Sequence, residues 1–485
     1  ILAQDSSRVP PSDARSMAPG APCGAASAQA ARRGPGGGTC WCGPGRRRAA
    51  WPARAALGRN SARGRVPDVP EAPCTRRYPD WLVAGQVPRF PADSSQAAER
   101  IRRGEPVILT GAPLCANVTG KWTLQYLAEN MAAYPFWKVQ VVRSDRQFFQ
   151  RIYGEGLGEG AIQEMTFAEF MQRSKAPGAY AYYLQTQLLG KNADTDGMAQ
   201  RIGGRDPFGA ALQADTRSFA WHWLEALLRE ANLGELGHCQ LWIGRGGALT
   251  PAHYDAMENL FAQIIGHKRF LLFPPEQVFD LYPYPVWHTL DSYSMVDFDR
   301  PDLQRFPGFR DARGLEAVVG PGEVLYLPTH WFHHVQALPG DNVSLSFWSE
   351  RPPAGSLRAS FQVAPPRLRP LLACRVAESA ARKGLGMGSL SAGGGGGREL
   401  SPSEFLHAVA TSQWPAGVHE STRSLGERLR AELAGHLGGD AAAEATLRGM
   451  ARDGRLYPGP PPEGDAGAVI HAEKGTTGGY WRGSG

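Results

Sequence analysis

Between residues 239 and 348 the chain consists of short apolar runs separated by glycine and proline turns. In order, the runs are QLWIG, FAQIIG, KRFLLFPP, EVLYLP, HHVQAL and NVSLSFW. Repeated strands of this length, bounded by turn residues, are typical of antiparallel barrels and jelly rolls. The pattern therefore predicts a mainly β fold for this region, either an all-β barrel or a double-stranded jelly roll.

Ahead of this region, apolar residues at helical spacing predict flanking helices. TFAEFMQR (residues 166–173) and FAWHWLEALLREANLG (residues 219–234) are the two clearest segments. A glycine closes the second one, where a helix C-terminus favours it. A further apolar run at residues 106–110 ends in a Gly-Ala-Pro turn and predicts a buried strand.

Helical periodicity returns near the C-terminal end of the chain. SPSEFLHAVA (residues 401–410) begins with a serine cap followed three residues on by a glutamate. SLGERLRAELAGHLGG (residues 424–439) repeats a leucine every fourth position. The repeated positions are Leu425, Leu429, Leu433 and Leu437. Helices this far from the β region need a surface to pack on, and that region and a second copy of the chain are the two alternatives.

Composition divides the chain into five segments. Residues 1–76 carry Pro, Gly, Ala and Arg without hydrophobic periodicity, which predicts a disordered basic tail, with a transit peptide as the alternative. Residues 77–352 form the predicted folded domain. Residues 353–400 include SAGGGGG and predict a low-complexity linker or insertion. Residues 401–458 form the predicted C-terminal helices, and residues 459–485 a flexible tail.

Most of the positive charge lies outside the predicted core. The formal net charge is +6, and eleven arginines precede residue 66. A near-neutral folded part argues against nucleic-acid binding, except through the basic tail. No apolar run approaches the roughly 20 residues of a membrane helix. The seven cysteines show neither a disulfide framework nor a CxxC zinc pattern, so we expect a reducing compartment, the cytoplasm or the nucleus or both.

Candidate metal ligands lie in TPAHYDAMENLFAQIIGHKRFLLFPP, where His253 and Asp255 stand two residues apart. Residues i and i+2 of a strand point to the same face, so their side chains can meet one cation. GPGEVLYLPTHWFHHVQAL offers a third ligand, His333 or His334, which point to opposite faces of a strand. Two histidines and one carboxylate leave open coordination positions, as in non-haem Fe(II) oxygenases.

Lys268 begins the apolar run KRFLLFPP, fifteen residues after His253. A buried ammonium is costly unless it meets an anion, and the far carboxylate of 2-oxoglutarate is such an anion. The hydroxyls of Thr250 and Tyr183 are candidate donors to the same carboxylate. The alternative is a surface lysine whose stem covers apolar residues while its charge stays in water.

The order of these features resembles the JmjC hydroxylases, and among them most closely the asparaginyl hydroxylases typified by factor inhibiting hypoxia-inducible factor. The resemblance covers residues 78–350 and rests on VPRF, EPVILT, KWTLQYLAEN, YYLQ, TPAHYD, FAQI, LYPYPV, VDFD, RFPGF and VVGPGEVLYLP. It implies a double-stranded β-helix of the cupin-like JmjC type with flanking α-helices. It also implies Fe(II), 2-oxoglutarate and O2, with ascorbate supporting turnover in vitro, and a protein or peptide substrate.

The resemblance also implies residue roles. It places the iron at His253, Asp255 and His333, because the family's ligand directly follows an aromatic pair, here Trp331 and Phe332. His334 is then structural. The implied 2-oxoglutarate site comprises Lys268, Thr250, Tyr183 and Asn259.

The predicted substrate side departs from the family pattern. Ser292 and Tyr293 replace the arginine and glutamine that hold the target asparagine in the asparaginyl enzymes, Met257 replaces a glutamine, and Ser346 an asparagine. These changes remove directional hydrogen bonds to an amide. The candidate substrate contacts are Gln185, Met257, Ser292, Tyr293 and Trp348.

Three functions follow from these observations. Asparagine hydroxylation is the main prediction. A JmjC oxygenase of another specificity is the second, whether a lysyl, arginyl or histidyl hydroxylase, a demethylase or a tRNA hydroxylase. An inactive peptide-docking module is the third. LGERLRAELAGHLGG and LRGMARDGRLY also resemble the paired helices through which the asparaginyl enzymes dimerise, which predicts a homodimer.

Overall fold

The computed structural model describes most of the chain between residues 76 and 451. The described ranges are 76–131, 137–143, 162–176, 180–189, 208–288, 290–351, 360–362, 364–385, 398 and 400–451. The predicted N-terminal tail up to residue 75, the SAGGGGG segment and the predicted tail 459–485 lie outside these residues. No helix among the described residues is long and apolar enough to cross a membrane.

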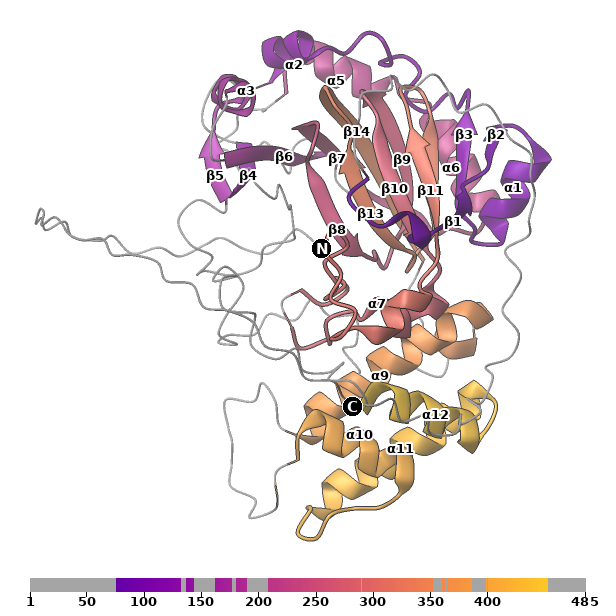
Figure 1. Cartoon of the computed structure of the whole chain (residues 1–485). Coiled ribbons are helices and arrows are strands. Elements are labelled where there is room, and N and C mark those ends of the chain that lie inside the picture. The colour runs from indigo at the N-terminus through magenta and orange to yellow at the C-terminus, as the bar shows by residue number, and fades with distance from the viewer. Residues whose placement is uncertain are drawn as a thin grey trace, which may run out of the picture. The chain divides into compact units, whose positions relative to one another are not determined.

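Two largely antiparallel sheets form the core (Figure 1). The smaller sheet has the order β1 (Val83–Gln86), β11 (Gly314–Val319), β10 (Lys268–Phe273), β13 (Phe332–Ala337) and β8 (Leu249–His253). The larger sheet has the order β2 (Arg89–Pro91), β3 (Val107–Thr110), β12 (Val324–Leu327), β9 (Glu258–Ile265), β14 (Asp341–Glu350), β7 (Glu235–Arg245), β6 (Tyr180–Leu189), β4 (Trp137–Arg143) and β5 (Ile162–Met165). Among the strands that the structure describes, the pairs β1–β11 and β2–β3 are parallel and the other pairs are antiparallel.

The two sheets pack face to face through an apolar cluster drawn from both of them. Phe261 of β9 meets Phe270 of β10 edge to face, with ring centroids 4.9 Å apart. Side chains on a strand alternate between its faces. Leu260 and Ala262, the neighbours of Phe261 on β9, therefore point the other way, into a second apolar cluster under the flanking helices. The predicted jelly-roll core is therefore confirmed.

Helices flank the larger sheet on its outer side. They are α1 (Ser95–Arg102), α2 (Leu124–Asn130), α3 (Phe167–Lys175), α5 (Ala210–Arg217) and α6 (Trp221–Glu230). Helix α3 begins with a capping box, in which Thr166 and Glu169 each accept a hydrogen bond from the other's backbone N–H. Both helices predicted from apolar spacing, α3 and α6, are present.

A second group of helices follows β14: α9 (Arg369–Gly384), α10 (Pro402–Thr411), α11 (Glu420–Leu437) and α12 (Asp440–Ala451), with the short α7 (Val278–Leu281) between β10 and β11. Short 3-10 turns are η1 (Asp80–Leu82), η2 (Pro275–Gln277), η3 (Pro307–Asp311) and η4 (Pro366–Leu368). The smaller sheet and α9–α12 share one apolar cluster on the outer face of that sheet.

Helix α9 corrects the prediction of a linker or insertion at residues 353–400. It is sixteen residues long and its buried positions include Leu371, Leu372 and Ala377. The same buried face carries Arg375 and Glu378. Two charged residues on the inner face interrupt the apolar stripe by which an amphipathic helix is recognised, so the sequence pattern did not indicate this helix.

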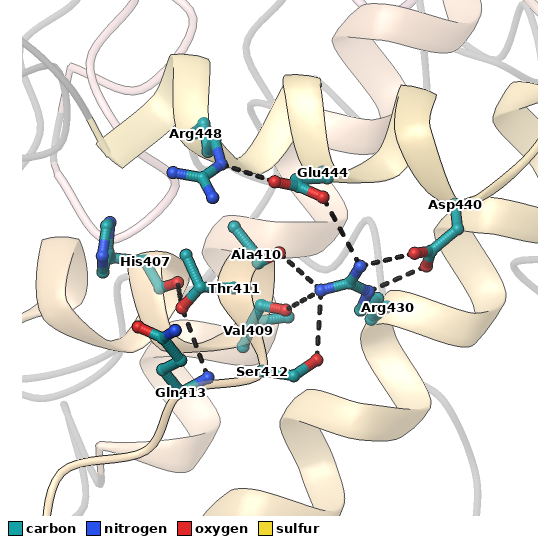
Figure 2. A network of polar contacts seen from close by, with 10 residues as sticks. All are labelled: His407, Val409, Ala410, Thr411, Ser412, Gln413, Arg430, Asp440, Glu444 and Arg448. Carbon is teal, nitrogen blue, oxygen red and sulfur yellow. Dashed lines mark hydrogen bonds and ion pairs between the residues drawn. The ribbon is translucent and has the colours of Figure 1, made fainter.

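Arg430 of α11 ties α10 and α12 together (Figure 2). Its Nη1 donates to the carbonyl of Val409 at 3.2 Å and to Ser412 Oγ at 3.1 Å, and also to the Ala410 carbonyl, at the C-terminus of α10. Its Nε donates to Asp440 Oδ1 at 2.8 Å, at the first turn of α12. One guanidinium thus satisfies carbonyls that the end of a helix leaves open and pairs with an acid at the start of the next helix.

The leucine face of α11 packs inside the chain. Leu429 and Leu433 are buried in the cluster shared with the smaller sheet, and Leu437 packs against it. Of the two packing surfaces considered for these helices, the β region of the same chain therefore accounts for these leucines. The homodimer stays a prediction, which sedimentation of the purified chain would test.

Candidate metal centre

Three of the predicted ligands meet at one end of the smaller sheet. His253 ends β8, Asp255 follows two residues later, and His333 lies on β13 directly opposite His253 in the antiparallel register. One ligand atom from each lies within 4.8 Å of the others. Asp255 Oδ1 is 4.0 Å from His253 Nε2, and its Oδ2 is 3.8 Å from His333 Nε2.

Backbone contacts fix which nitrogen of each histidine faces this cluster. His253 Nδ1 lies 2.9 Å from the carbonyl of Pro251, and His333 Nδ1 lies 3.0 Å from the carbonyl of Trp331. A carbonyl only accepts hydrogen bonds, so we infer that each Nδ1 carries the proton. Each Nε2 then presents a lone pair that can bind a cation beside the carboxylate.

The structure brings His333 to the cluster and not His334, which the sequence left open. His334 points to the opposite face of β13, where its ring stacks on Phe298 at 5.2 Å and meets Tyr78 edge-on at 5.5 Å. Burial lowers the pKa of His334 to about 3. A neutral, apolar-packed imidazole of this kind supports the fold.

Two hydrogen-bond donors hold Asp255. Trp348 Nε1 donates to Asp255 Oδ2 at 3.3 Å. The backbone N–H of His330 donates to the Asp255 carbonyl at 2.7 Å. Trp348, which was predicted as a substrate contact, therefore also orients a metal ligand, while its indole packs on His238 at 4.7 Å and on Trp242 at 5.9 Å.

A bulge in β8 decides the direction of Thr250. His333 pairs with His253, but Val335, two residues on, pairs with Thr250, three residues back. On a regular strand a spacing of three would place Thr250 and His253 on opposite faces. The extra residue reverses that alternation, so Thr250 faces the same interior as the ligands.

Lys268 also faces this interior, farther along the sheet. Its Nζ donates to Tyr183 Oη at 3.0 Å and to Ser344 Oγ at 2.8 Å, and the residue is 3% exposed. Burial lowers the pKa of Lys268 to about 7. Within the described part of the chain no carboxylate forms an ion pair with Lys268. Its ammonium meets two neutral hydroxyls and lies 5.1 Å from the ring centroid of Phe261.

Ser344 was not predicted as a site residue. The signal that could have indicated it is the alternation in NVSLSFW, where Ser344 and Ser346 occupy every second position between apolar residues. Gly244 has a related role on β7, because a Cβ there would lie 2.5 Å from the ring of Tyr183. The close approach of this ring to the backbone lets the Tyr183 hydroxyl reach Lys268.

Between Lys268 and the ligands the interior is lined by polar side chains. Trp242 Nε1 donates to Ser346 Oγ at 3.0 Å, and Asn259 Nδ2 donates to the same oxygen at 3.5 Å. The buried Asn259 Oδ1 has no hydrogen-bond partner among the described residues. Gln185 pairs with Trp242 in the register of β6 and β7 and so faces the same side. A buried acceptor without a partner is rare in a folded protein, and a polar ligand in this interior would supply the missing hydrogen bond.

The remaining predicted substrate contacts lie around the ligands. Tyr293 is 4% exposed, and its ring stacks on that of His253 at 4.7 Å and 14°. Ser292 has a positive φ of 71° in the chain just before it. Met257 is half-buried in the turn between β8 and β9. Tyr293 thus supports a ligand directly, which its sequence position did not indicate.

The residues present fit a non-haem iron centre. Two imidazoles and one carboxylate are the donor set that such centres use, with coordination positions left for other ligands. A buried ammonium and two hydroxyl groups in the same interior suit a carboxylate-bearing small molecule.

Comparisons with known proteins agree with this geometry. Residues 93–355, more than half of the chain, match the family described as Cupin-like domain. HSPB1-associated protein 1 of Bos taurus is 44% identical over 112 residues, which are 23% of this chain and 23% of that protein. Lysine-specific demethylase JMJ30 of Arabidopsis thaliana is 36% identical over 115 residues, 24% of this chain and 26% of that protein.

Lysine-specific demethylase 8 of Xenopus tropicalis is similar to the same degree, with 36% identity over 107 residues, 22% of this chain and 24% of that protein. The chain thus matches about a quarter of the length of these curated relatives.

Proposed function

Because the chain belongs to the cupin-like domain family, we propose that it is a JmjC-type oxygenase that uses Fe(II) and 2-oxoglutarate. One observation carries the proposal. A cluster of two histidines and an aspartate lies on the same interior face of the smaller sheet as Lys268, a buried lysine with no carboxylate partner among the described residues.

The distance between Lys268 and the metal cluster suits 2-oxoglutarate. Lys268 pairs with Ala337, four residues along β13 from His333, which corresponds to about 13 Å at about 3.3 Å per residue. The lysine side chain spans part of this distance, and a five-carbon dicarboxylic acid can span the rest. Its far carboxylate would then meet Lys268, Tyr183 and Thr250.

The chain's own residues supply binding, orientation and exclusion of water. When bound at His253, Asp255 and His333, Fe(II) supplies the redox chemistry that couples oxidation of 2-oxoglutarate by O2 to hydroxylation of a substrate. Trp348 orients Asp255, and Tyr293 orients His253. Lys268, with a pKa near 7, is partly neutral without ligand and takes up a proton when it meets a carboxylate.

For the substrate we propose a polypeptide side chain, with asparagine as the first to test. Support comes from the resemblance of LYPYPV and its neighbours to the asparaginyl hydroxylases. Ser292 and Tyr293 supply neither the guanidinium nor the amide of those enzymes, so the contacts to an asparagine would differ.

A second candidate is a cationic side chain such as methylated lysine. The aromatic wall formed by Trp242 and Trp348, with centroids 5.9 Å apart, favours a cation through cation–π attraction. Two of the similar proteins are named lysine-specific demethylases.

Release of succinate from 2-oxoglutarate by the purified protein, with Fe(II) and ascorbate, tests the proposal. Two peptides should be compared, an asparagine-containing ankyrin-type peptide and a methyl-lysine peptide. A mass gain of about 16 on the asparagine, one oxygen atom, would establish asparaginyl hydroxylation, whereas loss of methyl groups would establish demethylation. No succinate from a verified iron-loaded sample would refute the oxygenase and favour a peptide-docking module.

A further inference from the structure

The segment at residues 282–295, described except for residue 289 and here called the metal-side loop, borders the metal ligands. Its inner leg runs along the edge strand β8. The N–H of Tyr254 donates to the Ser292 carbonyl at 3.3 Å, and the N–H of Ser294 donates to the Ala252 carbonyl at 2.7 Å. An isolated bridge joins Tyr293 to His253, so the inner leg extends the smaller sheet beside a ligand.

The outer leg of the metal-side loop is bonded to the inner leg. The N–H of Tyr284 donates to the Tyr293 carbonyl at 2.8 Å, and the N–H of Met295 donates to the Tyr282 carbonyl at 2.8 Å. A displacement of the outer leg is therefore transmitted to Tyr293, whose ring lies on His253.

Two buried residues of α9 hold the outer leg. Arg375 Nη1 donates to the Tyr284 carbonyl at 2.7 Å and to Glu378 Oε2 at 2.8 Å. The same Glu378 oxygen accepts the N–H of Val286 at 3.1 Å. The ion pair thus presents one donor and one acceptor to two backbone groups of the loop.

Arg375 also contacts the residue between two of the ligands. Its guanidinium carbon lies 5.4 Å from the ring centroid of Tyr254. Tyr254 stacks on His330 at 5.4 Å and 29°. The backbone N–H of His330 in turn donates to the carbonyl of Asp255. Arg375 therefore reaches the centre by two routes, through the loop to His253 and through Tyr254 to Asp255.

Stability alone does not account for this pair. Arg375 is 7% exposed and Glu378 is 4% exposed, and Arg375 Nε and Nη2 have no hydrogen-bond partner among the described residues. Burial raises the pKa of the Glu378 carboxyl in spite of its contact with Arg375. Apolar residues of similar volume often replace such pairs without loss of stability, so the directional contacts are what the pair adds.

We propose that Arg375 and Glu378 are positioning residues of the metal centre. From α9 they hold the metal-side loop and Tyr254 so that His253 and Asp255 keep the arrangement that a bound metal requires. This inference rests on the proposed function in that it takes the cluster as a metal site.

The test compares variants of the full chain. Arg375→Met and the double variant Arg375→Met/Glu378→Met remove the directional contacts but keep apolar volume, and Glu378→Gln keeps the acceptor without the charge. Arg430→Met is the matched control, because Arg430 is also paired with carboxylates in the C-terminal helices but bonds only to α10 and α12 in Figure 2.

Two measurements are made on each variant. Anaerobic Co(II) titration, followed by the visible absorption of the bound ion, should show roughly tenfold weaker binding and an altered spectrum in Arg375→Met, the size of effect that groups supporting metal ligands have. Hydrogen exchange of the metal-free protein should become faster at residues 252–255 and 282–288. The double variant should recover thermal stability but not these two properties.

The outcomes separate the two hypotheses. If Arg375→Met and Arg430→Met lose similar thermal stability and both keep wild-type Co(II) binding and loop exchange, the pair is only structural and the inference is wrong. If the wild-type protein binds no Co(II), the proposed function fails, while loop exchange still tests whether α9 positions the loop. Should Arg375→Met not fold, Glu378→Gln and the double variant are judged by the same criteria.

Discussion

Cations in the strand interior and in the C-terminal helices meet different partners. Lys268, between the sheets, contacts two neutral hydroxyls, and burial lowers its pKa to about 7. Arg375 and Arg430, in the helices, are each paired with a carboxylate of their own chain. A cation that its own chain neutralises holds elements together. Lys268 meets hydroxyls and aromatic rings instead, as we expect of a cation that binds an anion from outside.

The largest effect is expected from removing one of the three metal ligands. We expect His333→Ala to reduce succinate release to background and abolish Co(II) binding while the far-UV circular dichroism is retained, because the His333 side chain faces the metal cluster and is not part of an apolar cluster. His334→Ala is the matched control on the other face of β13. It should lower the melting temperature through loss of packing on Phe298 and keep metal binding. Unfolding of His333→Ala would instead make His333 structural.

The next largest effect is expected from Lys268→Met, which keeps the length of the side chain. Loss of a charge-assisted hydrogen bond should raise the KM for 2-oxoglutarate by roughly 100-fold. The free energy of unfolding should stay equal or increase, because the variant removes a buried ammonium that no described carboxylate neutralises. Steady-state kinetics and urea unfolding measure the two quantities. If the variant is destabilised and its KM is unchanged, Lys268 has a structural role like that of Arg430.

The pH dependence of stability sharpens the same contrast. The pKa of Lys268 is about 7 in the folded chain against 10.5 for the free side chain. The unfolded state therefore binds more protons between these values, and the stability of the metal-free protein should rise with pH across this window. Lys268→Met should lack that rise. Affinity for 2-oxoglutarate should change in the opposite sense, falling by up to about tenfold per pH unit above pH 7, because the acid binds the ammonium form; calorimetry at several pH values measures it.

The smallest effect is expected from Arg430→Met. It removes hydrogen bonds to the end of α10 and the ion pair with Asp440, and we expect a loss of about 1–2 kcal/mol in the free energy of unfolding. The KM for 2-oxoglutarate should not change. Arg428→Met is the control on the same helix, because Arg428 bonds to Ser424 alone among the described contacts, and it should stay within about 0.5 kcal/mol of wild type.

Local spacing predicted much of the fold and part of the centre. The short apolar runs predicted the strands, and the spacing of His253 and Asp255 predicted two ligands on one face. The direction of Thr250 depends on a bulge, which arises from pairing with another strand and has no signal in the local pattern. The choice between His333 and His334 likewise depends on which face of β13 looks into the core.

Long-range contacts account for what the sequence did not predict. Helix α9 escaped prediction because Arg375 and Glu378 occupy its buried face, and their partners Tyr284 and Val286 lie about ninety residues earlier in the chain. Ser344 looked like one polar position in a strand until the register placed it beside Lys268. In both cases the partner is fixed by tertiary packing, which overrides local preference.

The position of α9 bears on how the protein can be divided. The segment that matches the family ends at residue 355, and all three histidine and aspartate ligands precede it. Arg375 and Glu378 follow it, both in the middle of α9. A fragment that ends at the family boundary would keep the ligands and lose the two residues that hold the metal-side loop. We therefore expect that the shortest fragment able to bind metal must extend past Gly384.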